Sequence, residues 1–200
     1  ADDPGAPEPL SLTVWSPSRI EGVALRLSGE RAPVPLVFHP SARSPRYDYR
    51  EAGPVCFVEQ ATGAVVAEAV VPVGWRRVLL IFAPLPAGAD RARRYRVYVL
   101  DDSAGGQPPG TLVVLNQSGE PQRGLVAGQV YDFTLGLSVP LTVPPQVTVT
   151  LQVRSRGRWW QSYAGGVALT AGQRALLVLL PPYYAGSREV QARWLTDGPE

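Results

Sequence analysis

The sequence of 200 residues lacks lysine and methionine and contains one cysteine and one histidine. A single cysteine excludes an internal disulfide, and so few sulfur and imidazole ligands give no pattern typical of a metal site. No apolar run reaches the roughly 18 residues that indicate a transmembrane helix. The net charge is only +2, which does not favour nucleic-acid binding. All 19 basic residues are arginine, which reflects either arginine-rich codon usage or a need for bidentate anion contacts.

Motifs of catalysis and cofactor binding are also missing from the sequence. There is no GxSxG, HExxH, CxxC or DxDxDG pattern, and GGQPPG at 105–110 lacks the lysine of a phosphate-binding loop. His39 precedes a proline and is expected to be a structural loop residue, Asp101-Asp102 to shape a turn, and Cys56 to be a buried small hydrophobe. We therefore expect no enzyme, cofactor or metal, with a hydrolase that has an unrecognised site as the alternative.

The sequence is rich in glycine and proline, which favour turns, and it contains segments in which polar and apolar residues alternate. Glycine (20) and proline (21) make up about a fifth of the chain, which favours many short strands. Residues 146–153 read QVTVTLQV and place Val147, Val149, Leu151 and Val153 on one face, as in a half-buried antiparallel strand. The opening ADDPGAPEPL is typical of a mature N-terminus after signal-peptide removal or of a trimmed chain. We expect an extracytoplasmic location, either periplasmic or secreted.

One sequence segment occurs twice in the chain in similar form. RVLLIFAPLPAG at 77–88 and RALLVLLPPYYAG at 174–186 each end in an Ala-Gly pair, and each is followed by a segment that ends in an acidic turn, at 93–103 and 188–198. With about seven strand-sized segments per half, this predicts a duplicated β-sandwich. The expected organisation is a Pro-rich leader at 1–9, a first repeat at 10–104 and a second at 105–200.

The repeated strands are apolar at every position, VLLIFA at 78–83 and ALLVLL at 175–180. Such runs predict burial on both faces of a strand. We expect their outer sides to be covered by the other half, so that the two units pack together, or by a second subunit in a homo-oligomer. The alternative is that long loops cover the alternate positions.

Two places on the predicted surface are candidate ligand contacts. Arg156-Gly157 is expected to form a tight hairpin turn, and a cluster of side chains surrounds it: Arg154, Arg156, Arg158, Trp159 and Trp160. Adjacent strand residues point to opposite faces, so we expect one tryptophan in the core and the other at the surface, where it could stack on a sugar or join the arginines around an anion. Tyr183 and Tyr184 form the second candidate, in a loop. The alternatives are a solvated turn and loop anchoring.

The segments PPGTLVVLNQSG (108–119) and GRWW (157–160), with a strand–PxxxxG–strand ending, give the sequence a family resemblance. It resembles uncharacterised exported bacterial proteins made of immunoglobulin-like β-sandwich repeats, which implies that fold and an exported location but no activity. Our leading hypothesis is a non-enzymatic extracytoplasmic protein that binds a protein partner or a carbohydrate of the cell envelope, or acts in envelope assembly. A structural, oligomer-forming component is an alternative.

Overall fold

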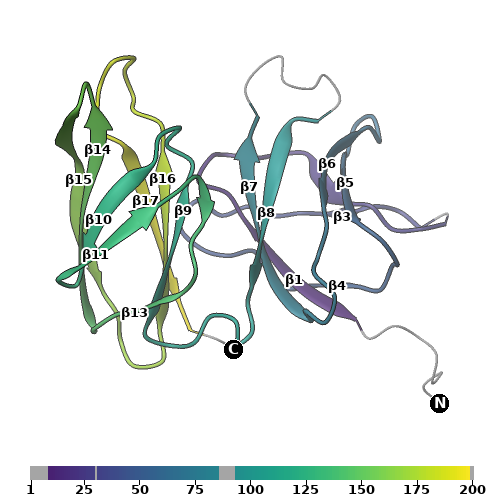
Figure 1. Cartoon of the computed structure of the whole chain (residues 1–200). Helices are drawn as coiled ribbons and strands as arrows, with labels where there is room; N and C mark the ends of the chain where they lie inside the picture. The colour runs from purple at the N-terminus through teal and green to yellow at the C-terminus, as the bar shows by residue number, and fades with distance from the viewer. Residues whose placement is uncertain (1–8, 30, 86–92, 199–200) are drawn as a thin grey trace. The chain divides into compact units, whose positions relative to one another are not determined.

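The structure, a computed structural model, describes residues 9–29, 31–85 and 93–198. Over these ranges the chain forms 17 strands and no helix (Figure 1), which confirms the all-β prediction. The chain divides into two compact units, 1–103 and 104–200. Residues 1–8 of the predicted leader and the Ala87-Gly88 pair lie outside the described residues. The described ranges contain no helix long and apolar enough to span a membrane.

The first unit consists of two four-stranded sheets, in the orders β4-β1-β7-β8 and β3-β2-β5-β6. β1 runs parallel to β7 and antiparallel to β4, and every other pair is antiparallel. The strands are β1 (Leu10–Trp15), β2 (Val23–Leu25), β3 (Val34–Pro35), β4 (Tyr47–Tyr49), β5 (Val55–Glu59), β6 (Val65–Ala69), β7 (Arg77–Pro84) and β8 (Tyr95–Asp101).

The second unit repeats this arrangement, with one sheet in the order β12-β9-β16-β17, to which β13 adds by pairing with β9, and another in the order β11-β10-β14-β15. β9 runs parallel to β16, as β1 does to β7. The strands are β9 (Thr111–Asn116), β10 (Gln122–Val126), β11 (Gln129–Phe133), β12 (Gly136–Leu137), β13 (Leu141–Thr142), β14 (Gln146–Ser155), β15 (Arg158–Ala168), β16 (Arg174–Leu180) and β17 (Gln191–Asp197).

The two units therefore share one arrangement, in which the first strand lies beside the second-to-last strand in one sheet (β1 beside β7, β9 beside β16) and the second strand lies beside the hairpin that precedes that second-to-last strand in the other (β2 beside β5, β10 beside β14). This agreement supports the predicted duplication. The prediction of two all-β sandwich-like units is confirmed. Each unit has more than the seven expected strands, and its first two strands lie in different sheets, whereas they are neighbours in an immunoglobulin constant domain.

Each unit has its own core, built from alternating residues of both of its sheets. In the first unit Leu12 and Leu80 of one sheet meet Phe57 of the other. In the second, Leu177 joins Leu151 from the alternating strand at 146–153, as predicted. Burying such side chains contributes about 1.5–3 kcal/mol each, so these alternating faces provide most of the driving force for folding.

The repeated strands β7 and β16 are buried on both faces, as their unbroken apolar runs predict. In β7 the core residue Leu80 lies between Leu79 and Ile81, which point the other way and are also buried. In β16 Leu177 lies between Leu176 and Val178, which are buried as well. The packing of the two halves through these strands, or of two subunits, stays a prediction.

The acidic turns after β8 and β17 have structural partners. The carboxylate of Asp101 accepts the backbone N–H of Ser103, which is the predicted Asx turn. Buried Asp102 pairs with Arg43. At the equivalent position of the second unit, Asp197 pairs with Arg174 (Oδ1 to Nε 3.3 Å), the buried arginine that begins the repeated segment 174–186.

Cys56 differs from its prediction as a buried residue. It lies on the outer side of β5, half-buried, with its Sγ 3.8 Å from the Glu68 carboxylate. Partial burial raises the pKa of the Cys56 thiol, and the nearby carboxylate raises it further. This keeps Cys56 in its less reactive thiol form.

Candidate functional site

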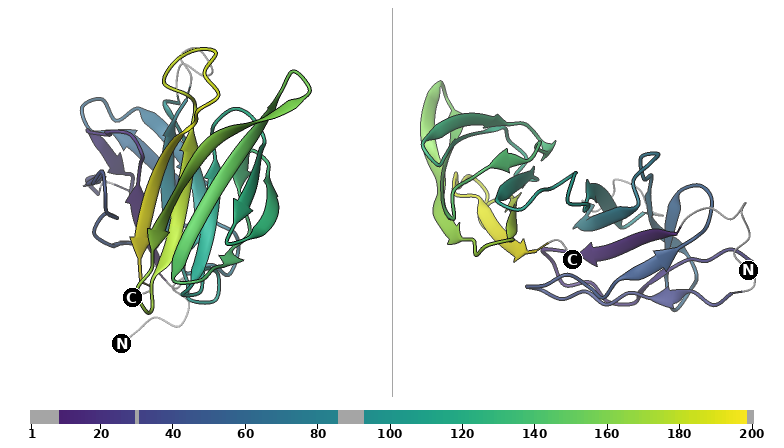
Figure 2. Two further views of the ribbon diagram at one scale, coloured as in Figure 1. Left: turned by 90° about the vertical axis from the view of Figure 1, so that its left-hand side faces the viewer. Right: turned by 90° about the horizontal axis from the view of Figure 1, so that it is seen from below.

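The candidate site is built at the tip of the hairpin that joins β14 and β15. Arg156 and Gly157 have φ values of +50° and +79°, the two positive angles that a type I′ turn requires. The predicted turn is therefore present, and an arginine occupies a left-handed position that favours asparagine or glycine. Figure 2 shows this tip and the loop between β16 and β17 at the same end of the second unit.

The expectation that one of the two tryptophans enters the core is wrong, because both are partly exposed, Trp159 at 42% and Trp160 at 39%. Trp160 does point to the inner face, where it pairs with Val153 of β14. Val153 also pairs with Gln122, the first residue of β10, so the hairpin extends past the neighbouring strand just where Trp160 lies. Trp160 therefore lies on the inner face of the sheet but beyond the end of the hydrophobic core.

Each tryptophan contacts an arginine from outside the hairpin. The guanidinium carbon of Arg123, on β10, lies 4.7 Å from the ring centre of Trp159. That of Arg188, in the loop after β16, lies 3.9 Å from the ring centre of Trp160. Both distances are within the range of cation–π attraction. The contact with Trp160 joins the hairpin to the β16–β17 loop.

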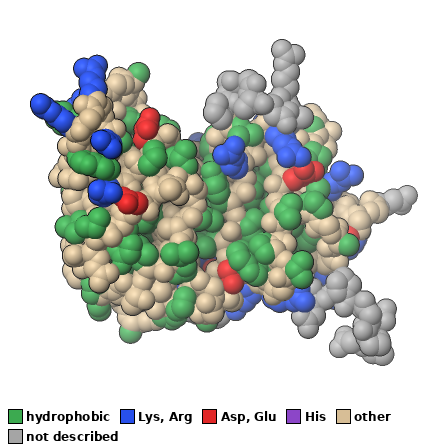
Figure 3. All heavy atoms as spheres, in the orientation of Figure 1, with side chains coloured by type: hydrophobic (Ala, Val, Ile, Leu, Met, Phe, Trp, Pro, Cys, Tyr) green, Lys and Arg blue, Asp and Glu red, His purple; other side chains and the backbone are tan. Residues whose placement is uncertain are grey.

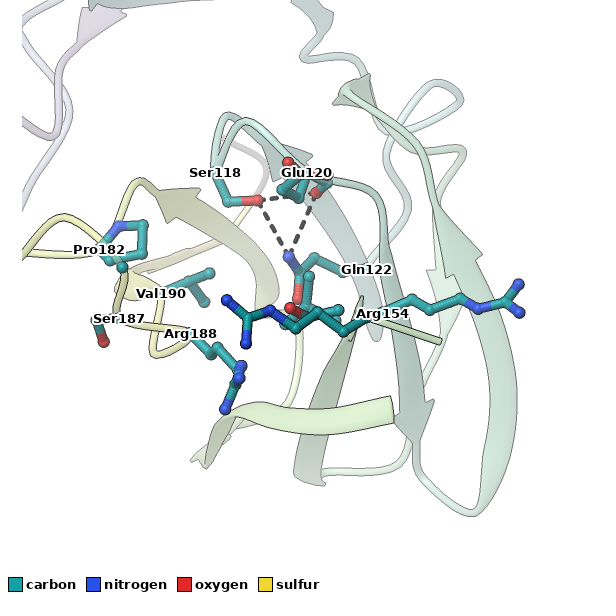
Figure 4. A pocket seen from close by; sticks show the side chains of 12 residues that line it. Ser118, Glu120, Gln122, Arg154, Pro182, Ser187, Arg188 and Val190 are labelled. Atoms are coloured by element: carbon teal, nitrogen blue, oxygen red, sulfur yellow. Dashed lines mark hydrogen bonds between the residues drawn. The ribbon is translucent and has the colours of Figure 1, made fainter. Parts of the chain in front are cut away.

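Beside this contact the surface forms a hollow of about 400 Å³, shown close up in Figure 4. It is bordered by the segment 118–122, by the end of β14 with its turn, and by the β16–β17 loop. Three arginines line it: Arg154, Arg156 and Arg188. In Figure 3 basic side chains gather at this end of the second unit. We call this feature the arginine-lined hollow.

A network of buried polar side chains supports the hollow from below. The side-chain amide of Gln122 donates to the Ser118 hydroxyl (3.2 Å), and its carbonyl oxygen accepts from the Ser162 hydroxyl (2.6 Å). Asn116 donates to the backbone carbonyl oxygens of Glu120 and Phe133, both at 3.0 Å. Because satisfied buried networks are rigid, these bonds hold the 118–122 segment in place.

The charges around the hollow are unbalanced. Across the described part of the chain, Arg154, Arg156 and Arg188 make no ion pair and no hydrogen bond with a carboxylate. One carboxylate, that of Glu120, also lines the hollow. The local excess of positive charge means that an anion entering the hollow meets guanidinium groups that need no exchange of partners.

The structure brings only part of the predicted cluster to the hollow. Arg154 and Arg156 line it, and Trp160 is connected through Arg188. Arg158 and Trp159 are exposed on the hairpin but do not line it. Tyr183 and Tyr184 are 70% and 79% exposed in the β16–β17 loop and also lie outside the lining.

Sequence reasoning missed the remaining lining residues. Arg188 stands at the start of the repeated segment 188–198, which indicated a strand rather than a site. Ser118, Glu120 and Gln122 follow β9 in a stretch that carries no recognisable signal.

Other candidates for chemistry are isolated. His39 is exposed in the loop after β3. Among the residues that the structure describes, no three histidine, cysteine, aspartate or glutamate side chains lie together as metal ligands would. Of the residues predicted as ligand contacts, Arg154 and Arg156 lie together in the lining of the arginine-lined hollow.

No protein-family model matches the sequence, and no curated protein matches it significantly. The function is therefore argued from the site itself.

Proposed function

We propose that the protein acts by binding rather than by catalysis, and that its second unit holds an anionic group of an extracytoplasmic ligand in the arginine-lined hollow. The observation that carries the proposal is that Arg156 and Arg188 line a hollow of about 400 Å³ without a carboxylate partner among the described residues, with Arg154 in the lining but its side chain directed away from the hollow (Figure 4). Guanidinium groups bind carboxylates, phosphates and sulfates through paired, charge-assisted hydrogen bonds. The hollow has the chemistry to hold such a group.

The arginines are also partly positioned before a ligand arrives. The tight turn fixes the backbone of Arg156, and the Trp160 ring supports the guanidinium of Arg188. Such preorganisation reduces the side-chain entropy lost on binding. The envelope location is a proposal that rests on the resemblance to exported β-sandwich proteins, and a glycan or a protein partner of the envelope could supply the anion.

Calorimetric titration with pyrophosphate and citrate, which present phosphate and carboxylate groups, tests the site. We expect Arg156→Asn and Arg188→Ala to weaken binding roughly tenfold to hundredfold, because each removes charge-assisted hydrogen bonds. Arg158→Asn is the matched control, since Arg158 is exposed on the same hairpin but does not line the hollow.

Two results would reject the proposal. One is that neither anion binds at low ionic strength. The other is that Arg158→Asn weakens binding as much as Arg156→Asn, which would reveal a general charge effect in place of a site. Light scattering on the same samples tests the oligomer-forming alternative, which expects a stable assembly without ligand.

A further inference from the structure

The outer face of the hairpin carries a second group of polar and aromatic side chains. On the outer face of the β11-β10-β14-β15 sheet, the strand registers place four polar residues in one row across the four strands, Asp132, Arg123, Gln152 and Gln161. Trp159 stands next to this row, two residues before Gln161 on β15, where it pairs with Arg154 and has the Arg123 guanidinium carbon 4.7 Å from its ring centre. We call these five residues the outer-face platform.

The ends of the platform differ in how their polar groups are engaged. Arg123 and Asp132 hold each other through two bonds of 2.8 and 3.2 Å. The amides of Gln152 and Gln161 are exposed, and across the described residues they have no hydrogen-bond partner. The platform thus offers free amide donors and acceptors beside an indole ring that is 42% exposed.

We propose that the outer-face platform binds a pyranose oligosaccharide. A sugar ring has an apolar side of C–H groups that packs on an aromatic ring, and hydroxyls at its edge that bond to planar side chains with paired donors and acceptors. Trp159 supplies the ring, and Gln152 and Gln161 supply the planar groups. The Arg123–Asp132 pair adds a donor and an acceptor; because the Arg123 guanidinium lies 4.7 Å from the centre of the Trp159 ring, the sugar would pack on the other face of that ring.

The dimensions of the sheet favour a chain of sugars over a single one. Adjacent strands lie about 4.8 Å apart, so a row across four strands is about 14 Å long. The row follows one register line of the sheet. This extended surface suits a linear glycan that lies across the strands.

The site is distinct from the arginine-lined hollow, because Trp159, Gln152 and Gln161 do not line the hollow. The two proposals can therefore fail separately. Arg156→Asn is expected to weaken anion binding and to leave oligosaccharide binding unchanged. Trp159→Ala is expected to do the reverse.

The experiment is affinity electrophoresis and calorimetry of the full chain with cellohexaose, chitohexaose and hexagalacturonate, which differ in their ring substituents. We expect saturable binding of at least one of them, lost or weakened at least about tenfold in Trp159→Ala and about threefold to tenfold in Gln152→Ala and Gln161→Ala. Gln146→Ala is the control, since Gln146 is exposed on the same strand but at its other end. Because all four side chains are exposed, these variants should fold.

The proposal is overturned if none of the three oligosaccharides binds, or if Gln146→Ala weakens binding as much as Trp159→Ala. It is also overturned if Trp159→Ala instead abolishes a concentration-dependent dimer seen by light scattering, because a second copy of the chain would then be the occupant.

Discussion

Replacing Arg156 by asparagine should make the second unit more stable while weakening its anion binding. Arg156 has φ of +50° at the first central position of a type I′ turn, followed by Gly157. A left-handed backbone costs a residue with a Cβ about 1–2 kcal/mol, and Asn-Gly is the pair that this turn favours most. The arginine therefore strains the hairpin at a position where its side chain reaches the hollow.

The size of the gain follows from the backbone alone, because Arg156 makes no hydrogen bond or ion pair within the described residues that asparagine would lose. Asparagine recovers part of the left-handed cost, so we expect the free energy of unfolding to rise by about 1 kcal/mol. With a urea dependence of about 1–3 kcal/mol per molar, the unfolding midpoint should rise by about 0.3–1 M.

The assay is urea unfolding followed through amide NMR signals of β14 and β16, so that the second unit is observed separately from the first. Ala127→Asn is the matched control. Ala127 has φ of +48° before Gly128 in the same kind of turn between β10 and β11, at the opposite end of the sheet. It should stabilise the unit to a similar extent without affecting anion binding. The reasoning is wrong if Arg156→Asn lowers the midpoint, or if Ala127→Asn also weakens binding.

Two further predictions concern the sheet that carries the site. Gly124→Ala should destabilise the second unit by about 1–3 kcal/mol, because a Cβ there would lie 2.5 Å from the Phe133 ring and 2.9 Å from Leu151, both buried. Adding Phe133→Leu should recover part of that loss in urea unfolding, and no recovery would locate the clash elsewhere. The hydrogen bond from Arg123 lowers the pKa of Asp132, so this pair contributes stability above the unfolded pKa of aspartate and loses it as the pH falls through the lowered folded pKa. NMR titration should find the Asp132 midpoint raised in Arg123→Gln, and an unchanged midpoint would contradict this cause.

The sequence predicted the strands whose residues alternate or are uniformly apolar. The β14 strand and both repeated strands, β7 and β16, occur where their patterns indicated. The short strands β4 and β12, of three and two residues, were not predicted as separate elements. Segments of two or three residues are too short to show the alternation of apolar and polar residues that indicates a strand. They are strands because they pair with β1 and β9.

The site could be predicted only in part, because alternation indicates a face but not where the neighbouring strands end. Trp160 points inward as its position required, yet it remains exposed because β10 begins opposite Val153. The hollow joins three segments that are far apart in the sequence, so Arg188 and Gln122 gave no joint signal. Local sequence predicted the turn at Arg156-Gly157 and, of the lining, Arg154 and Arg156 beside it.

In the first unit, the arginine equivalent to Arg188 is paired with a carboxylate. The registers of β8 and β17 against the repeated strands make Arg93 the equivalent of Arg188. Arg93 pairs with Glu68 on β6, and its neighbour Arg94 pairs with Glu59 at the end of β5. In the second unit the corresponding hairpin, β14–β15, contains no aspartate or glutamate, and arginines and tryptophans stand at its tip.

The sandwich forms equally well when carboxylates pair with these arginines, because the first unit has the same strand arrangement and its Arg93 and Arg94 are paired with glutamates. In the second unit Arg156 and Arg188 lie at one hollow without a carboxylate partner among the described residues, and Arg156 has a left-handed backbone. Both features oppose stability, and the contact of Arg188 with the Trp160 ring offsets only part of their cost. An anionic ligand would offset the charge, and for this reason we place the binding site at the tip of the second unit and not at the equivalent tip of the first.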